Sequence, residues 1–194
     1  MQLVRDDPIV ALILACEFGL WVLLGVGLVA RYLLRLRLLS TLLLAAIPLL
    51  DVVLVVAVTL DLLRGAEPRS VHGLAGAYLG FSVAFGPSIV RWADVRFAHR
   101  FAGGPAPAKQ VKGTPERVAH LWREWSRVVV AAAITSAVLG GLILFVATPE
   151  QSGVLSWWIG RVWVVAGIWL VAGPLWESGR SRTPEERPTT ADRR

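Results

Sequence analysis

The charged residues of this chain are separated from five long apolar stretches. Of its 20 Lys and Arg and 14 Asp and Glu side chains, only three lie inside these stretches, which together make up more than half of the 194 residues. Each stretch has 20 or more residues, enough for a helix to cross a hydrocarbon core of about 30 Å. The sequence therefore predicts an all-α, polytopic membrane bundle with five transmembrane helices, at residues 9–30, 38–60, 71–90, 128–147 and 154–176.

Lys and Arg residues gather in alternate loops, and this asymmetry predicts the orientation of the bundle. The segments 31–37, 91–127 and 177–194 hold 16 basic residues, whereas the N-terminus and the two other loops hold three. Because basic residues near span ends stay on the cytoplasmic side, we expect the N-terminus outside and the C-terminus in the cytoplasm. Residues 177–194 have no large apolar side chains, so we expect a disordered cytoplasmic tail.

The long connection 91–127 carries helical signals at both ends. Residues 91–101 can continue the third span until the glycines and prolines of 103–107 stop the helix. Residues 114–116, Thr-Pro-Glu, are typical of a helix start, and an amphipathic pattern follows them. We interpret 91–127 as an amphipathic cytoplasmic loop that lies at the lipid headgroups. Binding of a partner or of anionic lipids at the cytoplasmic face is the alternative role for this segment.

Small and aromatic residues indicate helix packing and membrane interfaces. Gly73, Gly76 and Gly80 share one face of the third span, where we expect another helix of the same chain to approach closely; dimerisation is the alternative. Tryptophans near span ends are typical of the aromatic belts at the two membrane surfaces. The candidates are Trp92, Trp122, Trp125, Trp157, Trp158 and Trp176.

Three charged residues stand inside the predicted spans: Glu17, Asp51 and Arg161. Counted from the outer ends of their spans, all three lie about 11–14 Å deep. A charge in hydrocarbon costs at least ~2.5 kcal/mol, so we expect the three to converge on one another or on water, in an outward-facing pocket. Two carboxylates against one guanidinium leave a negative charge that a proton or a visiting cation would balance.

Other polar residues are predicted to border this pocket. Tyr78 and Ser82 share one face of the third span at a similar depth, and Asp61 and His72 are expected at the outer mouth. Pro48, one turn before Asp51, frees a backbone carbonyl, as helix interruptions that line binding sites do. The structural alternative is that the charged cluster only specifies how the helices pack.

Signatures of catalysis and of metal binding are weak. His72, His99 and His120 fall on different sides of the membrane in the predicted topology, which argues against a transmembrane haem pair. We expect no metal and no cofactor, and no nucleophile paired with a base can be recognised. The net charge of +6 is explained by the cytoplasmic loops, so we expect no nucleic-acid partner.

Several strings resemble a family of small bacterial integral membrane proteins of the YmcC type. They are RWADVRFAHRFAGGPAP at 91–107, HGLAGAYLGFSVAFG at 72–86, CEFGLW at 16–21 and the pair Pro48 and Asp51. The resemblance covers residues 9–127 and is weaker beyond them. It implies a multi-pass protein of the bacterial plasma membrane, and it carries over no functional residue.

The leading hypothesis for function is non-enzymatic: binding or translocation of a small solute, cation or proton at the intramembrane pocket. Five spans are few for an autonomous transporter, so a homo-oligomer or another membrane protein is an expected partner beside the lipid bilayer. The second hypothesis is a structural or accessory membrane subunit whose basic cytoplasmic loop recruits a partner or anionic lipid. An intramembrane enzyme acting on a lipid or quinone is the third.

Overall fold

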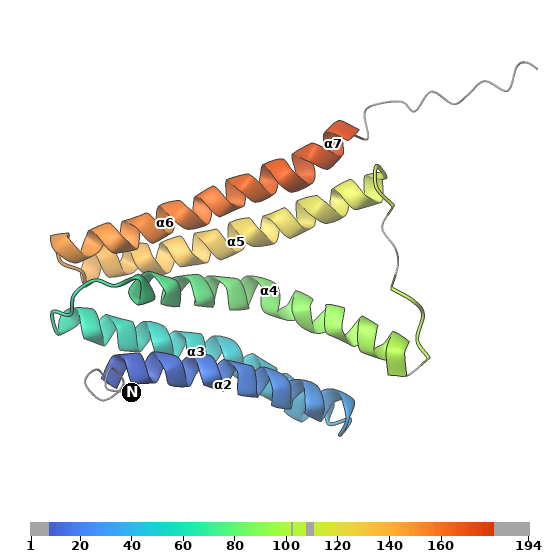
Figure 1. The fold of residues 1–194 in the computed structure, drawn as a ribbon, viewed down its shortest axis with the longest axis horizontal. Coiled ribbons are helices and arrows are strands. Elements are labelled where there is room, and N and C mark those ends of the chain that lie inside the picture. Colours follow the sequence, from blue (N-terminus) through green and yellow to red (C-terminus); the bar gives the residue numbers. More distant parts are fainter. Residues whose placement is uncertain (1–7, 102, 108–110, 181–194) are drawn as a thin grey trace, which may run out of the picture.

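A computed structural model describes residues 8–101, 103–107 and 111–180 of the chain, and within these ranges it is all-α. Five long helices follow one another along the chain (Figure 1), and the fifth continues through a π-helical turn, η1, into a short last helix. The all-α prediction is confirmed for this part of the chain. The bounds are α2 (Pro8–Tyr32), α3 (Arg37–Leu63), α4 (Ser70–Phe101), α5 (Pro115–Phe145), α6 (Pro149–Leu170), η1 (Val171–Leu175) and α7 (Trp176–Arg180).

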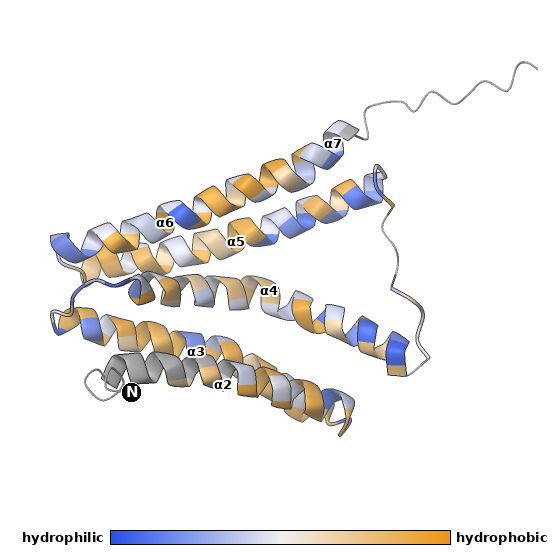
Figure 2. Ribbon diagram, viewed as in Figure 1, coloured by the Kyte–Doolittle hydropathy of each residue, from blue (hydrophilic) through white to orange (hydrophobic). Residues whose placement is uncertain are grey.

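Four helical segments are long and apolar enough to cross a membrane: Leu38–Leu63, Ser70–Phe101, Pro115–Phe145 and Pro149–Gly179. The described side chains of α2 add a shorter apolar stretch, Trp21–Tyr32. Figure 2 shows hydrophobic residues along the middle of the helices and hydrophilic residues toward several of their ends. This pattern is the one that a bilayer imposes on a helical bundle.

The helices form two antiparallel pairs on either side of α4 (Figure 1). α2 packs on α3 and α6 packs on α5, while α4 contacts α3, α5 and α6. One end of the bundle carries the connections 64–69 and 146–148, and we name it the His72 end. The opposite end carries the turn 33–36 and the facing ends of α4 and α5, and we name it the Arg31 end.

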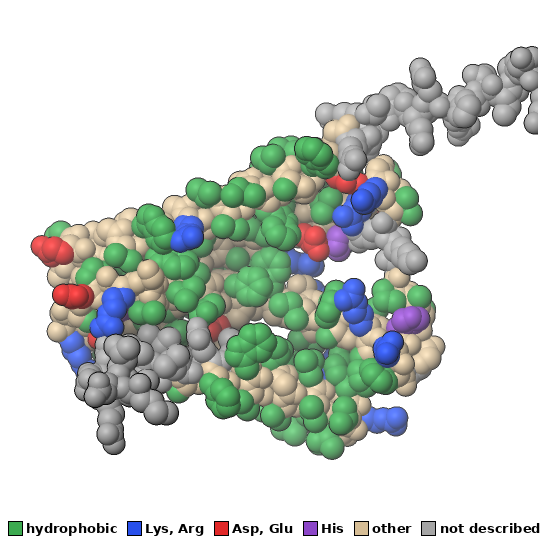
Figure 3. All heavy atoms as spheres, viewed as in Figure 1, with side chains coloured by type: hydrophobic (Ala, Val, Ile, Leu, Met, Phe, Trp, Pro, Cys, Tyr) green, Lys and Arg blue, Asp and Glu red, His purple; other side chains and the backbone are tan. Residues whose placement is uncertain are grey.

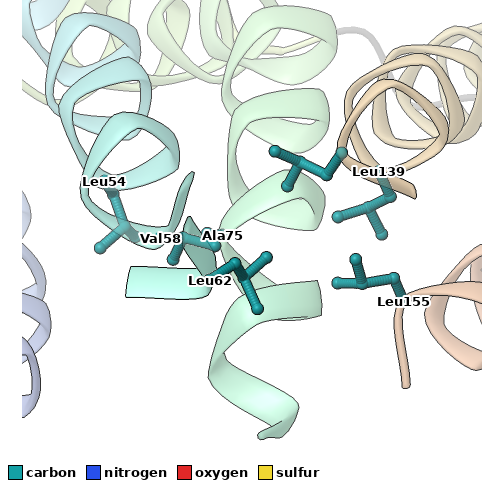
Figure 4. Close-up of a cluster of buried hydrophobic side chains, with 7 residues drawn as sticks. Leu54, Val58, Leu62, Ala75, Leu139 and Leu155 are labelled. Carbon is teal, nitrogen blue, oxygen red and sulfur yellow. The ribbon is translucent and has the colours of Figure 1, made fainter. Parts of the chain in front are cut away.

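The apolar core lies toward the His72 end, where four helices meet. Figure 4 shows side chains from α3, α4, α5 and α6 pointing toward one another. Gln151 of α6 adds a polar contact beside them, because its Nε2 donates to the carbonyls of Leu62 (3.3 Å) and Ala66 (2.8 Å). This end of the bundle is therefore closed. The buried core residues are Leu54, Val58, Leu62, Ala75, Leu139, Leu142 and Leu155.

The three glycines of α4 lie where α5 and α6 approach that helix. A Cβ atom at Gly73 would overlap the Trp158 ring of α6, and one at Gly76 would lie 2.8 Å from Leu139 of α5. At Gly80, the atoms in the way include the backbone carbonyl of Ala131. Close approach of two helix backbones needs small residues, so this face joins α4 to the α5–α6 pair within the chain.

The second half of α4 diverges from α5, and the molecule is open between these helices at the Arg31 end (Figures 1 and 3). Pro87 lies inside α4, and a proline removes a backbone hydrogen bond and bends a helix. The divergence leaves α4 beside α2 and α3 at this end. The site described below is formed there.

Both ends of the segment 91–127 are helical, since α4 continues to Phe101 and α5 begins at Pro115. Thr114 caps α5, because its hydroxyl accepts from the amide of Arg117 at 3.3 Å. The predicted tail needs correcting at its start. Residues 177–180 belong to α7, and the buried Glu177 accepts a 2.6 Å hydrogen bond from the amide of Gly113. The rest of that tail, 181–194, lies outside the described residues.

Candidate functional site

Asp51 is a buried acid in the middle of α3 that keeps one carboxylate oxygen without a hydrogen-bond partner. Its exposed fraction is 3%, and no group in the structure bonds to its Oδ2 atom. Ser82 of α4 lies beside the same cavity as Asp51, and its hydroxyl donates to the Leu79 carbonyl at 3.2 Å. A buried polar atom without a partner is costly, so such an atom beside a cavity indicates a group that a ligand can satisfy.

A cavity of about 320 Å³ adjoins Asp51, between α2, α3 and α4. Its lining is almost entirely apolar, and three aromatic residues, Trp21, Tyr78 and Phe81, face it with Asp51. Tyr78 and Ser82 thus line the same cavity as Asp51. We name this space the Asp51 cavity; it is lined by Trp21, Leu24, Leu44, Ile47, Pro48, Asp51, Tyr78, Phe81, Ser82, Gly86, Ile89 and Val90.

Two further cavities extend from the Asp51 cavity to the Arg31 end. The first, of about 530 Å³, shares five lining residues with the Asp51 cavity and reaches Arg31, Arg91 and Asp94. The second, of about 580 Å³, also contains Arg31 and Asp94 and reaches Arg35. The three spaces form one groove with α3 at its back and α2 and α4 as its walls. We call it the α2–α4 groove.

An ion pair spans the groove between α2 and α4. The guanidinium of Arg31 donates twice to Asp94, with Nε to Oδ1 at 2.5 Å and Nη2 to Oδ2 at 2.6 Å. The Tyr32 hydroxyl donates to the same carboxylate at 2.7 Å, and the Tyr32 ring stacks on Phe97 with centroids 3.9 Å apart. A bidentate arginine–carboxylate pair is both strong and directional, so it sets the distance between the two walls.

Sequence reasoning did not identify this ion pair. Arg31 belongs to the basic segment 31–37 and Asp94 to the amphipathic segment 91–127, and the sequence pattern did not pair them. The sequence nevertheless contains a signal for this ion pair. Arg31 follows the first predicted span, and Asp94 follows the third. These two spans cross the bilayer in the same direction, so both residues are expected at the same membrane surface. An acid and an arginine at one depth are candidates for pairing.

The predicted mouth of the pocket, Asp61 and His72, needs correcting. His72 is 1% exposed, and its Nε2 lies 3.0 Å from Asp61 Oδ2. The amide of Arg69 donates to His72 Nδ1 at 2.9 Å, so both ring nitrogens have partners. The apolar core separates this pair from the Asp51 cavity. The α2–α4 groove therefore leads away from Asp61 and His72, toward the Arg31 end.

The predicted convergence of three charges also needs correcting. Arg161 lies exposed on α6, and its guanidinium sits over the Trp157 ring, 4.5 Å from the centroid. Asp51 lines a cavity formed by other helices. Depth along a helix is predictable from residue counts, but the direction in which a side chain points around the helix axis depends on packing. The side chain of Glu17, the third member, lies outside the described part of the chain.

The tryptophans predicted at the membrane surfaces fall into two groups. Trp125 and Trp158 pack within the bundle: Trp125 donates its Nε1 proton to the carbonyl of Ala166 at 3.1 Å, and Trp158 lies against Gly73. The other four have side chains exposed by 41–62%, as residues in contact with lipid would have. They are Trp92, Trp122, Trp157 and Trp176.

The described residues contain no cluster of three or more His, Cys, Asp or Glu side chains that could hold a metal ion. Among the described residues, the α2–α4 groove offers one carboxylate without an ion-pair partner, Asp51, in an apolar and aromatic cavity, with arginines toward one end.

The comparisons with known proteins agree with a membrane location. The chain is 34% identical over 152 residues to "Uncharacterized membrane protein YmcC" of Bacillus subtilis (strain 168), which covers 76% of this chain and 81% of the relative. No protein-family model matches the chain, and no solved structure matches it. Given this similarity and the apolar helices long enough to span a bilayer, the chain is an integral membrane protein that belongs to the YmcC family.

Proposed function

We propose that the protein binds a lipophilic cation at Asp51, in competition with a proton, through a groove that opens toward the Arg31 end. The observation that carries this proposal is the buried Asp51 carboxylate, whose Oδ2 has no partner although it adjoins a 320 Å³ cavity. A carboxylate in hydrocarbon is stabilised by a proton or by a positively charged ligand. A site that accepts either one can exchange them.

The lining of the cavity fits an organic cation better than a hydrated metal ion. Trp21, Tyr78 and Phe81 place aromatic rings around the space that Asp51 adjoins. Aromatic faces attract cations, and the attraction is strongest when water is excluded. A small metal ion needs several oxygen ligands, and the lining side chains supply few. We therefore expect a protonated amine or a phosphonium-like cation with apolar substituents.

The topology proposed with this function has five spans, with α2 as the first. α2 is 25 residues long, the length that a single membrane crossing needs. The Lys and Arg asymmetry supports an N-terminus outside the cell and places the Arg31 end at the cytoplasmic face of a bacterial plasma membrane. The groove would then load from the cytoplasmic side. A homo-oligomer or another membrane protein would supply the remainder of a translocation path.

A structural or accessory role is the second candidate, and a specific observation favours it. At the His72 end, buried polar groups already act as packing contacts, since His72 bonds to Asp61 and Gln151 bonds to the 62–66 turn. Under this proposal Asp51 would also be a packing group. Its substitution by asparagine would then lower stability rather than ligand binding.

The experiment is equilibrium binding of tetraphenylphosphonium to the purified full-length protein, compared with the Asp51→Asn and Asp61→Asn variants. We expect Asp51→Asn to weaken binding by at least about tenfold, because the counter-charge in the cavity is lost. Asp61→Asn is the matched control: it removes another buried acid of the same helix that lies outside the Asp51 cavity. Equal affinity of wild type and Asp51→Asn would refute the cation site.

Dicyclohexylcarbodiimide supplies an independent readout, because it modifies protonated carboxyl groups in apolar surroundings. We expect the peptide that contains Asp51 to be modified faster than the peptides that contain Asp61 or Asp94, whose carboxylates are hydrogen-bonded. Tetraphenylphosphonium should slow the modification of Asp51. Faster labelling at Asp94, or no protection by the cation, would contradict the proposal.

A further inference from the structure

The part of the α2–α4 groove nearest the Arg31 end changes from charged to apolar along its length. At its end lie Arg35, Arg31 and Asp94; farther in, its walls are formed by Leu44, Val83 and other apolar side chains. An arginine-rich end that continues into an apolar channel matches an amphipathic anion, with its charge at one end and its chain at the other.

Two of the three arginines in this part of the groove are free to bind an anion. Arg31 is neutralised by its bidentate pair with Asp94. Arg35 and Arg91 are exposed, and in the described ranges neither makes a hydrogen bond or an ion pair. The charge that remains at the mouth of the groove is therefore positive. Arg35 lines the cavity beyond the Arg31–Asp94 pair, and Arg91 lines the cavity on its other side.

The backbone conformation of Arg35 adds a second observation. Its φ is 57°, in the left-handed region that a glycine adopts more easily than an arginine. A glycine at position 35 would thus adopt the backbone conformation of the 33–36 turn with less strain. An arginine retained at this position agrees with a role for its side chain at the mouth of the groove.

We propose that this part of the groove binds one anionic phospholipid of the leaflet at the Arg31 end. Arg91 holds its phosphate on the inner side of the Arg31–Asp94 pair, and Arg35 contacts the headgroup on the outer side. One acyl chain lies between α2 and α4 along Leu44, Val83 and Val90. Each arginine can donate two hydrogen bonds to a phosphate. The Arg31–Asp94 pair stays intact and holds the two walls apart.

The occupant is a membrane lipid rather than a soluble anion, because the walls of the groove are membrane-spanning helices and its rim is apolar. Val83 and Ile89 of α4 are 45% and 43% exposed, so the groove is open along its side, where the acyl chains of the bilayer lie. A soluble anion could form ion pairs with the arginines, but it would leave the apolar part of the groove unfilled.

The lipid site doesn't depend on the function proposed for Asp51. It uses other charged residues and lies closer to the Arg31 end, although Leu44 and Val90 line both the Asp51 cavity and the path of the acyl chain. Asp51→Asn should therefore leave lipid binding unchanged, whereas substitution of Arg35 and Arg91 should abolish lipid selectivity. Failure of one proposal can thus be told from failure of the other.

The test is native mass spectrometry of the full-length protein in a maltoside detergent, with equal amounts of dioleoyl phosphatidylglycerol and dioleoyl phosphatidylcholine. We expect a preferred one-to-one adduct with the anionic lipid. The pair Arg35→Gln and Arg91→Gln should reduce this adduct about tenfold or more, since each arginine near an anionic lipid contributes roughly a factor of five. Arg35→Lys with Arg91→Lys keeps both positive charges and should retain most of the binding. Loss of the adduct in the glutamine variant alone would then reflect loss of charge and not loss of folding.

The matched control is Arg96→Gln with Arg100→Gln, which removes two exposed arginines of the same helix that do not line the groove. This variant should keep the adduct. Phosphatidylglycerol with a photoreactive group on its acyl chain should crosslink to peptides from 41–48 and 83–90. The proposal is overturned by equal adducts of the two lipids, by equal loss in the control, by full competition from inorganic phosphate, or by crosslinks mainly on α5 and α6.

Discussion

Arg31 and Asp94, 63 positions apart in the chain, form a bidentate ion pair that joins the ends of α2 and α4. The same pair separates the two outer parts of the α2–α4 groove, since both residues line both cavities. Packing on α3 holds α2 in the bundle. The Arg31–Asp94 pair adds a link from α2 to α4, and a ligand that enters from this end must move past it.

The first prediction concerns the strength of this pair. Asp94→Asn and Arg31→Gln should each lower the free energy of unfolding, and the double variant should lower it by less than the sum. Because both side chains are partly exposed, we expect a coupling of about 1 kcal/mol. A double-mutant cycle from SDS unfolding in mixed micelles measures it. Additive effects of the two single variants would show that the pair contributes no coupling.

The second prediction concerns the close contact between α4 and the α5 backbone at Gly80. Gly80→Ala should destabilise the protein by about 1–3 kcal/mol, because the new Cβ meets the backbone carbonyl of Ala131, which cannot rotate away. The matched control is Gly140→Ala on α5, where nothing lies within 4 Å of the added Cβ. Thermal unfolding followed by circular dichroism compares the two. A similar melting temperature for both variants would mean that α4 and α5 are farther apart than described.

A third prediction concerns the contact between Glu177 and Gly113. Glu177→Ala removes the acceptor for the Gly113 amide, so α7 should separate from the start of α5. Hydrogen exchange followed by mass spectrometry should show faster exchange in 111–116 and 171–179. Glu177→Gln retains an acceptor oxygen and should exchange almost as wild type. Unchanged exchange in the alanine variant would contradict a stabilising role for this contact.

The fourth prediction tests the proposed orientation of the bundle. With the single native cysteine removed by Cys16→Ser, a cysteine at Ser152 lies at the His72 end and one at Lys112 at the Arg31 end. In intact cells, a membrane-impermeant maleimide should label Ser152→Cys, whereas Lys112→Cys should react only after the membrane is opened. The reverse pattern would invert the topology and would place the mouth of the groove outside the cell.

The sequence by itself determined the features that depend on distance along the chain. Apolar stretches of 20 or more residues predict membrane helices because a bilayer leaves no water to bond exposed backbone groups. The end of α4 at Phe101 and the start of α5 at Pro115 follow from Gly, Pro and an N-cap threonine, which act locally. Asp51, Tyr78 and Ser82 could be assigned to one layer by counting residues, and they line one cavity.

Only the tertiary structure decided which residues meet across helices. Arg161 and Asp51 lie at similar predicted depths, but rotation of each helix about its axis is set by packing, and the α4 glycines in contact with α5 and α6 set it for α4. The groove faces the Arg31 end because α4 diverges from α5 there, while Leu139 and Leu155 close the other end. Residue counts specify depth; side-chain packing specifies direction, and direction decides which charges pair.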